Sequence, residues 1–270
     1  MPGPVIRIFS DLHFRDGESR LQHLDALAPL LEGADQLVFN GDTVDSQDPA
    51  PGGGFPEVQA FFARYSDHVT FLTGNHDPDI SPHAELSLNN GRVWITHGDV
   101  LFDGIAPWSE LRPIMAARIQ ANAHGIPPGE LALIETRLRL NRLACIGLVE
   151  SHSRSRRTPA AIAIRLAHEL ISPSRIFAML KVWRTTPQLA RRLARAQRPA
   201  AQLVVLGHTH YPGVWRHTDG PVVVNTGSFS RPLGNLFVEL RGDHVRVIKI
   251  TRRHGKFHPG RLVTEFPLAP

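Results

Sequence analysis

Five short apolar segments of this chain end in the same way, and this repeated ending constrains the fold more than any other feature. Each segment is followed at once by Asp, Asn or His, beside a glycine or on a tight exit from the segment. The five endings are Asp11-Leu12-His13, Gly41-Asp42, Gly74-Asn75-His76-Asp77, His97-Gly98-Asp99 and Gly207-His208-Thr209-His210. In open α/β sheets, sites form outside the carboxyl ends of the strands. We therefore expect the five endings to meet at one edge of a sheet.

The order of the predicted elements indicates an α/β fold that carries an insertion. Apolar runs predict strands at 4–10, 36–40, 69–73, 92–96, 202–206, 222–226, 235–240 and 244–250. Leucine spacing predicts a helix at 18–32, and Pro56 suits the first turn of a second helix at 56–65. Residues 103–199 have the pattern of helices. The sequence thus predicts a core made of 1–102 and 200–270, with a second sheet facing the first, and a helical insertion, 103–199.

The positive charge of the chain is concentrated in this insertion. Residues 103–199 contain 16 Lys and Arg against 6 Asp and Glu, a net +10, whereas the remainder has a net charge of −5. Such asymmetry indicates an anionic partner, which could be nucleic acid, a membrane surface or an acidic substrate. A single cysteine excludes an intrachain disulfide. The N-terminus has no signal-peptide pattern and no apolar stretch reaches about 18 residues, so we expect a cytoplasmic location, with peripheral contact at the inner face of the membrane left open.

The polar residues at the five endings are of the types that bind divalent metals. Carboxylate and amide oxygens and imidazole nitrogens suit Mn, Fe, Zn or Co. Seven candidate ligands are too many for one ion but fit two ions that share a carboxylate, a common arrangement for displacement at phosphorus. They are Asp11, His13, Asp42, Asn75, His97, His208 and His210. Alternation along an extended segment would point Asp11 and His13 the same way, and likewise His208 and His210, and the glycines would permit close backbone approach. Each motif alone is more often a turn or a cap than a ligand. All five in this order favour a metal site.

The five blocks together resemble the calcineurin-like metallophosphoesterase superfamily, over residues 5–100 and 202–228. The resemblance implies a four-layer α-β-β-α sandwich with a dinuclear centre. One metal would be held by Asp11, His13, Asp42 and His210, and the other by Asp42, Asn75, His97 and His208, with Asp42 as the bridge. Mn is the first expectation for both ions, with Fe, Zn and Co as alternatives.

The same resemblance assigns roles to residues that are not ligands. His76 would face the phosphoryl oxygens or the leaving group, as a proton donor or a stabiliser of charge. Asp77 or Asp45 would orient the ligands. For Asp45, Asp99 and Asn225, a turn or structural role is an equal alternative.

The insertion suggests where substrate selectivity arises. Pro173 after Ser172 and Pro187 after Thr186 predict two helix starts, and 131–148 predicts another helix. Arg191, Arg192 and Arg195 are candidate substrate-binding residues. The insertion could be a packed cap with solvated arginines, a membrane-facing or lipid-binding cap, or a nucleic-acid surface. Its three aromatic residues, Trp108, Phe177 and Trp183, are few for base stacking.

Within the superfamily, the blocks SDLHF, GDTVD and HGDVLFD are similar to those of the bacterial UDP-2,3-diacylglucosamine hydrolases. His76 is a departure, because that group usually has Arg there. The resemblance implies a phosphodiesterase or pyrophosphatase that acts on a lipid-linked nucleotide in lipid A biosynthesis. A metal-dependent nuclease, another phosphodiesterase or phosphatase, and a non-catalytic scaffold of the same fold are the alternatives.

Overall fold

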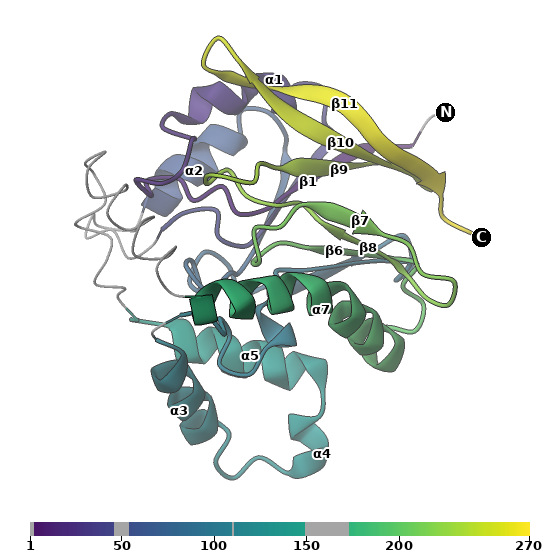
Figure 1. Ribbon diagram of the computed structural model, residues 1–270. Coiled ribbons are helices and arrows are strands. Elements are labelled where there is room, and N and C mark those ends of the chain that lie inside the picture. The colour runs from purple at the N-terminus through teal and green to yellow at the C-terminus, as the bar shows by residue number, and fades with distance from the viewer. Residues whose placement is uncertain (1–2, 46–53, 110, 149–172) are drawn as a thin grey trace.

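Two β-sheets pack face to face, and helices cover the outer face of each (Figure 1). The computed structural model describes residues 3–45, 54–109, 111–148 and 173–270. The first sheet has the strand order β11 (Lys256–Pro267), β10 (His244–Arg253), β9 (Leu236–Arg241), β1 (Val5–Phe9), β2 (Gln36–Asn40) and β3 (His68–Leu72). The second has the order β4 (Glu85–Leu88), β5 (Val93–Thr96), β6 (Leu203–Leu206), β8 (Val222–Asn225) and β7 (Gly213–Trp215).

Apolar side chains hold the four layers together. Between the sheets, Ile8 and Val38 of the first sheet share a buried cluster with Val205 of the second. The outer face of the first sheet packs on the 3₁₀ helix η1 (Leu24–Leu27) and on helices α1 (Ala28–Leu31) and α2 (Phe55–Phe62). The outer face of the second sheet packs on helices α5 (Ile134–Cys145) and α7 (Pro173–Gln197), through side chains such as Trp94 and Ala194. The predicted α/β sandwich fold is confirmed.

The parallel strands direct their carboxyl ends to one edge of each sheet. Strands β1, β2 and β3 are parallel in the first sheet, and β5, β6 and β8 are parallel in the second. A backbone contact joins the two edges, because the His208 amide that follows β6 donates to the Asp11 carboxylate that follows β1 (3.0 Å). The five polar endings therefore meet at one edge of the sandwich.

Three strands were not predicted, and one predicted helix is shorter than expected. Strands β4, β7 and β11 lie at edges of the sheets, where one side of the strand is unpaired and the apolar pattern is weak. The segment predicted as a helix at 18–32 forms only η1 and α1. Its leucines are nevertheless buried, so their spacing reflects burial of the side chains rather than a continuous helix.

The described residues between β5 and β6 form helices, as predicted. After the 3₁₀ helix η3 (Asp99–Leu101) come α3 (Arg112–Asn122), α4 (Pro128–Leu131), α5 and α7. Among the helices in the described ranges, none is both long and apolar enough to cross a membrane.

The prediction that a new helix starts at Pro187 is wrong, because α7 continues through this residue. Proline removes the backbone donor that would bind the Trp183 carbonyl, and the Thr186 hydroxyl donates to the neighbouring Val182 carbonyl (2.7 Å). Beyond the proline, Ala190 and Ala194 are fully buried against the second sheet. This packing holds the second half of the helix in line. The expected cap at Ser172 lies outside the described residues.

Candidate metal centre

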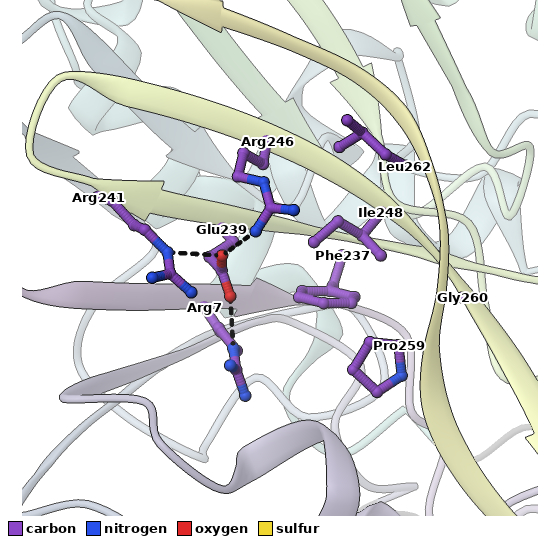
Figure 2. A pocket seen from close by; sticks show the side chains of 9 residues that line it. All are labelled: Arg7, Phe237, Glu239, Arg241, Arg246, Ile248, Pro259, Gly260 and Leu262. Carbon is purple, nitrogen blue, oxygen red and sulfur yellow. Dashed lines mark hydrogen bonds and ion pairs between the residues drawn. The ribbon is translucent and has the colours of Figure 1, made fainter.

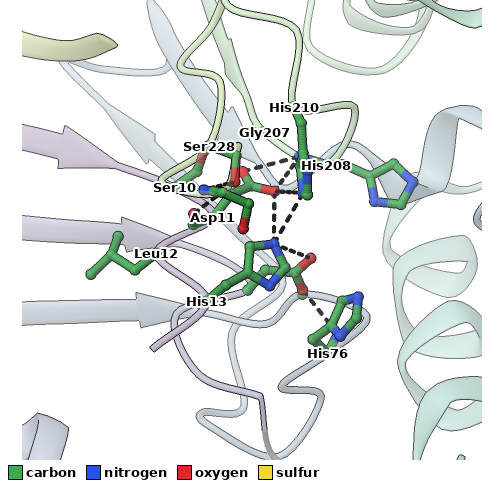
Figure 3. A network of polar contacts seen from close by, with 12 residues as sticks. Ser10, Asp11, Leu12, His13, His76, Gly207, His208, His210 and Ser228 are labelled. Atoms are coloured by element: carbon green, nitrogen blue, oxygen red, sulfur yellow. Dashed lines mark hydrogen bonds and ion pairs between the residues drawn. The ribbon is translucent and has the colours of Figure 1, made fainter. Parts of the chain in front are cut away.

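Four predicted ligands form a first group at the carboxyl ends of β1, β2 and β6 (Figure 3). His13 Nε2 lies 3.0 Å from His210 Nε2 and 3.8 Å from Asp42 Oδ2. The Asp11 Oδ1 atom lies 3.2 Å from His210 Nε2. Three of the four residues are buried, and His210 is partly exposed. The first group is therefore open to solvent on the His210 side.

A second group shares Asp42 with the first and adds His97 and His208. Asp42 Oδ2 lies 3.2 Å from His97 Nε2. The side-chain oxygen of Asn75 lies 3.3 Å from His97 Nε2 and 2.8 Å from His208 Nδ1. All seven predicted ligands thus lie in two adjacent groups joined by one carboxylate.

The spacing of these atoms fits two divalent cations. Two atoms that each bind an ion at about 2.1 Å, at tetrahedral to right angles, are about 3.0–3.4 Å apart. Separations of 3.0 Å for His13 to His210, 3.2 Å for Asp42 to His97 and 3.3 Å for Asn75 to His97 match this range. Mixed oxygen and nitrogen ligands suit Mn, Fe, Zn or Co. The residues present therefore fit a dinuclear centre.

The ligands are positioned by an unusual backbone rather than by strand alternation. Asp11, His13, Asp42, His208 and His210 all have positive φ, between 47° and 65°. Residues other than glycine rarely adopt this conformation, and it persists only where the surrounding structure enforces it. Two backbone hydrogen bonds help to enforce it. The Asp11 amide donates to the Gly41 carbonyl (3.1 Å), and the His13 amide donates to the Asp42 carbonyl (2.9 Å). The expectation that extended alternation aligns Asp11 with His13, and His208 with His210, is wrong, since all four residues have a left-handed φ.

Two of the glycines let the ligand loops approach one another, as predicted. A Cβ atom on Gly74 would overlap the carboxylate and amide of Asp42. One on Gly207 would overlap the Asp11 carboxylate and the Ser10 side chain. Neither glycine has room for a side chain, so both loops depend on glycine here.

Burial and neighbouring charges set the protonation of the centre. Burial alone would raise the pKa of Asp42, but the charges of His97 and His76 hold that pKa well below its usual range. Burial alone would lower the pKa of His97, but Asp42 and Asp11 raise it well above its ordinary value. For His13, burial dominates and lowers the pKa to about 4.

Asp77 lies beneath the ligands and positions them. Its Oδ1 accepts hydrogen bonds from the amides of Asp42 (2.9 Å) and Gly74 (2.8 Å), and its Oδ2 accepts from Thr43 (2.6 Å) and Val44 (3.3 Å). Burial and the nearby Asp42 charge raise the pKa of Asp77 to about 7. The carboxylate thus ties the loop after β2 to the loop after β3 without entering either ligand group.

His76 lies beside the first group but belongs to neither (Figure 3). Its backbone amide donates to Asp42 Oδ1 (2.9 Å). Its ring lies edge-on to the ring of His13, with centroids 5.0 Å apart, and its Nδ1 is 3.9 Å from Asp45 Oδ1. The side chain is 17% exposed, so it can meet a ligand that enters from solvent.

Asp45, Asp99 and Asn225, for which the sequence favoured neither a structural nor a functional role, each have a defined partner. Asp99 accepts a hydrogen bond from Asn141 of α5 (3.0 Å). Asn225 donates to the Gly207 carbonyl (2.6 Å), which fixes the turn before His208. Asp45 contacts His76, as described above. Asp99 and Asn225 therefore support the site from behind.

Two backbone carbonyls that the sequence could not reveal orient the imidazoles. His97 Nδ1 lies 3.0 Å from the Asn40 carbonyl, and His208 Nε2 lies 3.0 Å from the Ile105 carbonyl. Each contact leaves the other ring nitrogen to face the ligand group. Ile105 has a φ of 69°, which is rare for a β-branched residue. Any residue supplies a carbonyl, so no sequence signal marks these positions.

The candidate substrate arginines do not lie with the ligands. Arg191 and Arg195 both bind Asp219, at 2.5 Å and 2.8 Å, in the turn that precedes β8. The ligands follow the carboxyl ends of the strands, so this turn is at the opposite end of the second sheet (Figure 1). Arg192 is on the same half of α7. Trp183, in the first half of α7, lies nearer the metal ligands than these arginines, because it donates to the Thr209 carbonyl between His208 and His210.

Comparison with known proteins decides the family. The calcineurin-like phosphoesterase family model matches residues 4–212, which include every predicted ligand. The chain is a calcineurin-like phosphoesterase. Together with the two ligand groups, this makes it a metal-dependent phosphoesterase. Among curated proteins, no sequence matches this phosphoesterase.

Solved structures resemble the phosphoesterase only distantly. They include Vacuolar Protein Sorting 29 from Cryptosporidium parvum (15% identity, TM-score 0.48, 99% of this chain and 100% of that one). A predicted phosphoesterase from Streptococcus pneumoniae has 16% identity and a TM-score of 0.43, and covers 99% of both chains. A dimetal phosphatase from Danio rerio has 14% identity and a TM-score of 0.43, with 99% of both chains covered. These similarities are too low to assign a substrate.

Proposed function

We propose that this phosphoesterase hydrolyses a phosphodiester or pyrophosphate bond at a pair of divalent cations, with Mn as the first candidate for both ions. One observation carries the proposal: Asp42 Oδ2 lies 3.2 Å from His97 Nε2 in one ligand group and 3.8 Å from His13 Nε2 in the other. A shared carboxylate between two groups is the arrangement of two-metal hydrolases. Cations bound there would polarise the phosphoryl group and lower the pKa of water.

Residues that do not bind the cations position the bridging carboxylate and act on the leaving group. Asp42 is fixed through its own backbone amide by Asp77, so the bridging carboxylate is held in place before a cation arrives. His76 is the partly exposed imidazole beside the ligands. In the proposed reaction it donates a proton to the leaving oxygen or stabilises the charge that develops there.

For the substrate class we propose a lipid-linked nucleotide such as UDP-2,3-diacylglucosamine. The first half of α7 supports this choice. Trp183 of α7 donates from Nε1 to the Thr209 carbonyl (3.0 Å), between the ligands His208 and His210. Its ring also stacks on Tyr211, with centroids 4.7 Å apart and an interplanar angle of 13°. This half of the helix therefore borders the proposed metal centre.

Exposed apolar side chains precede Trp183 on the same helix. Phe177 is 72% exposed, and Met179 and Leu180 are 37% and 44% exposed. Phe177 is six residues before Trp183, which is about 9 Å along a helix. Large apolar side chains in water next to a polar site are typical of a surface that binds apolar groups. Acyl chains attached to a phosphoester would meet this surface while the phosphoester reaches the cations.

Product analysis by mass spectrometry tests the reaction and the substrate together. The Mn-loaded protein is incubated with UDP-2,3-diacylglucosamine in detergent, and separately with a generic aryl phosphodiester. Release of UMP and the lipid monophosphate is the expected result. Turnover of the aryl ester alone would leave the chemistry in place and discard the lipid substrate, and cleavage of single-stranded DNA or RNA instead would favour a nuclease. Absence of turnover on every substrate would favour a non-catalytic scaffold.

A pair of variants isolates the role of the apolar surface. Phe177→Ser should raise KM for the lipid substrate several-fold and leave turnover of the aryl ester unchanged. Leu262→Ser is the matched control, because Leu262 is 42% exposed but belongs to β11 of the other sheet. Equal effects of the two variants would show that α7 does not contact the acyl chains.

A further inference from the structure

A group of three arginines lies near the metal centre but outside it. Arg20 donates its backbone amide to the Phe229 carbonyl (3.0 Å), and the Phe229 amide donates to the carbonyl of the ligand Asp11 (3.0 Å). Two hydrogen-bonded steps of about 4.8 Å place the Arg20 backbone roughly 10 Å from that of Asp11. Arg231 follows Phe229 by two residues. The third member, Arg252, is the penultimate residue of β10.

Two phenylalanines bring these arginines together. The rings of Phe229 and Phe257 meet edge-on, with centroids 5.0 Å apart. The Arg252 guanidinium lies over the Phe257 ring, 5.6 Å from its centroid. The Arg20 guanidinium donates to the Phe229 carbonyl (3.3 Å) and to Asn235 Oδ1 (3.3 Å). The aromatic pair therefore supports the Arg252 guanidinium, and the Phe229 backbone holds the Arg20 guanidinium beside it.

In the described part of the chain, the positive charges of this group have no acidic partner. Within the described ranges, no carboxylate forms an ion pair with any of the three arginines. Burial, followed by the nearby charges of Arg252 and Arg231, lowers the pKa of Arg20. Arg231 and Arg252 are exposed, and Arg20 is half-buried. An anion bound among them would remove a repulsion that the chain itself leaves in place.

A second set of three arginines, on the first sheet, has a carboxylate partner (Figure 2). Arg7, Arg241 and Arg246 line a pocket on the first sheet, and all three bind Glu239, at 3.0, 2.9 and 2.9 Å. One buried carboxylate contacts all three guanidinium groups, so each arginine of this pocket already has an acidic partner. The group of Arg20, Arg231 and Arg252 lacks such an acid in the described part of the chain.

We propose that Arg20, Arg231 and Arg252 form a binding site for a phosphoryl group, separate from the metal centre. Guanidinium groups present paired donors that match phosphate oxygens, and those that lie over an aromatic ring keep their donors free. The choice of phosphate over carboxylate rests on the proposed phosphoester chemistry, whereas the existence of an anion site does not. The phosphoryl group would belong either to a substrate that carries a second phosphate or to a free phosphate-bearing ligand.

Binding of pyrophosphate to the metal-free protein tests the site without any turnover. Isothermal titration should show saturable binding that Arg231→Gln and Arg252→Gln each weaken on the order of tenfold, the loss of one charge-assisted contact. Both side chains are exposed, so both variants should keep the far-ultraviolet circular dichroism of the original protein. Arg261→Gln is the control, since Arg261 is exposed on β11 and its substitution removes the same positive charge. Absence of saturable binding, or an equal loss with Arg261→Gln, would overturn the site.

Steady-state kinetics then separate the two sources of the phosphoryl group. If the substrate supplies it, Arg231→Gln should raise KM for a substrate with two phosphates and leave KM for an aryl phosphodiester unchanged. If a free ligand supplies it, neither KM should change while pyrophosphate binding is still weakened. A protein that binds pyrophosphate but has no phosphoesterase activity would keep the anion site and reject the proposed function.

Discussion

The histidine ligands of the centre differ in their protonation before a cation binds. In the metal-free protein, burial lowers the pKa of His13 and of His208 to about 4, so both are neutral near pH 7. His97 differs, because Asp42 and Asp11 raise its pKa well above the ordinary value against the effect of burial. A proton on His97 competes with a cation, since a metal binds only the neutral imidazole.

Metal binding at neutral pH should therefore release a proton from His97. Affinity should fall as pH decreases, because the protonated form of His97 becomes more populated while His13 and His208 stay neutral until pH approaches about 4. Titration calorimetry with Mn²⁺ in two buffers of different ionisation enthalpy measures the protons released. Identical binding enthalpies in the two buffers would contradict the predicted protonation of His97.

His76 should affect turnover without affecting metal content. Its backbone amide, which holds Asp42, is retained in His76→Ala, and its ring is in neither ligand group. We expect kcat to fall on the order of 100-fold, the size of a lost general acid, with both metals still bound. His83→Ala is a control, because that side chain is exposed. Full activity of His76→Ala would remove this residue from the mechanism.

At the level of elements, the ligand loops depend on glycines that pack directly against ligand carboxylates, Gly74 against Asp42 and Gly207 against Asp11. Gly74→Ala would push a methyl group into Asp42, and Gly207→Ala would push one into Asp11 and Ser10. Each should lower the free energy of unfolding by about 1–3 kcal/mol and reduce metal content. Gly129→Ala on α4 meets no atom within 4 Å and should lower neither quantity. Chemical denaturation and metal analysis of the three variants provide the measurement, and a metal-replete Gly207→Ala would contradict the predicted overlap.

The same elements show how far the sequence could predict this molecule. Buried strands such as β2 and β6 are continuous apolar runs, and the side chains that follow them were readable as ligands. The edge strand β11 was missed because its exposed positions and its Pro259 and Gly260 obscure the pattern. The carbonyl of Ile105 and the left-handed turns of the ligands depend on tertiary contacts, which local sequence does not encode. The new helix start expected at Pro187 was wrong for the same reason, since α7 is continuous through this residue and Ala190 and Ala194 beyond it pack on the second sheet.

At the scale of the whole molecule, two sheets each contribute part of one centre. The first sheet supplies Asp11, His13, Asp42 and Asn75 from the loops that follow its parallel strands, and the second supplies His97, His208 and His210. The Asp11 carboxylate accepts from the His208 amide (3.0 Å), so the centre also joins the sheets. Cations bound only by the folded state should stabilise the protein against unfolding.

The most direct measurement is electron paramagnetic resonance of the protein loaded with Mn²⁺, together with metal analysis. Two ions that share Asp42 would be about 3.5–4 Å apart and should give the spectrum of a spin-coupled pair, with two Mn per chain. Asp42→Ala should lose the coupled signal, both metals and turnover together. One Mn per chain, or two uncoupled ions in the unaltered protein, would contradict a dinuclear centre bridged by Asp42.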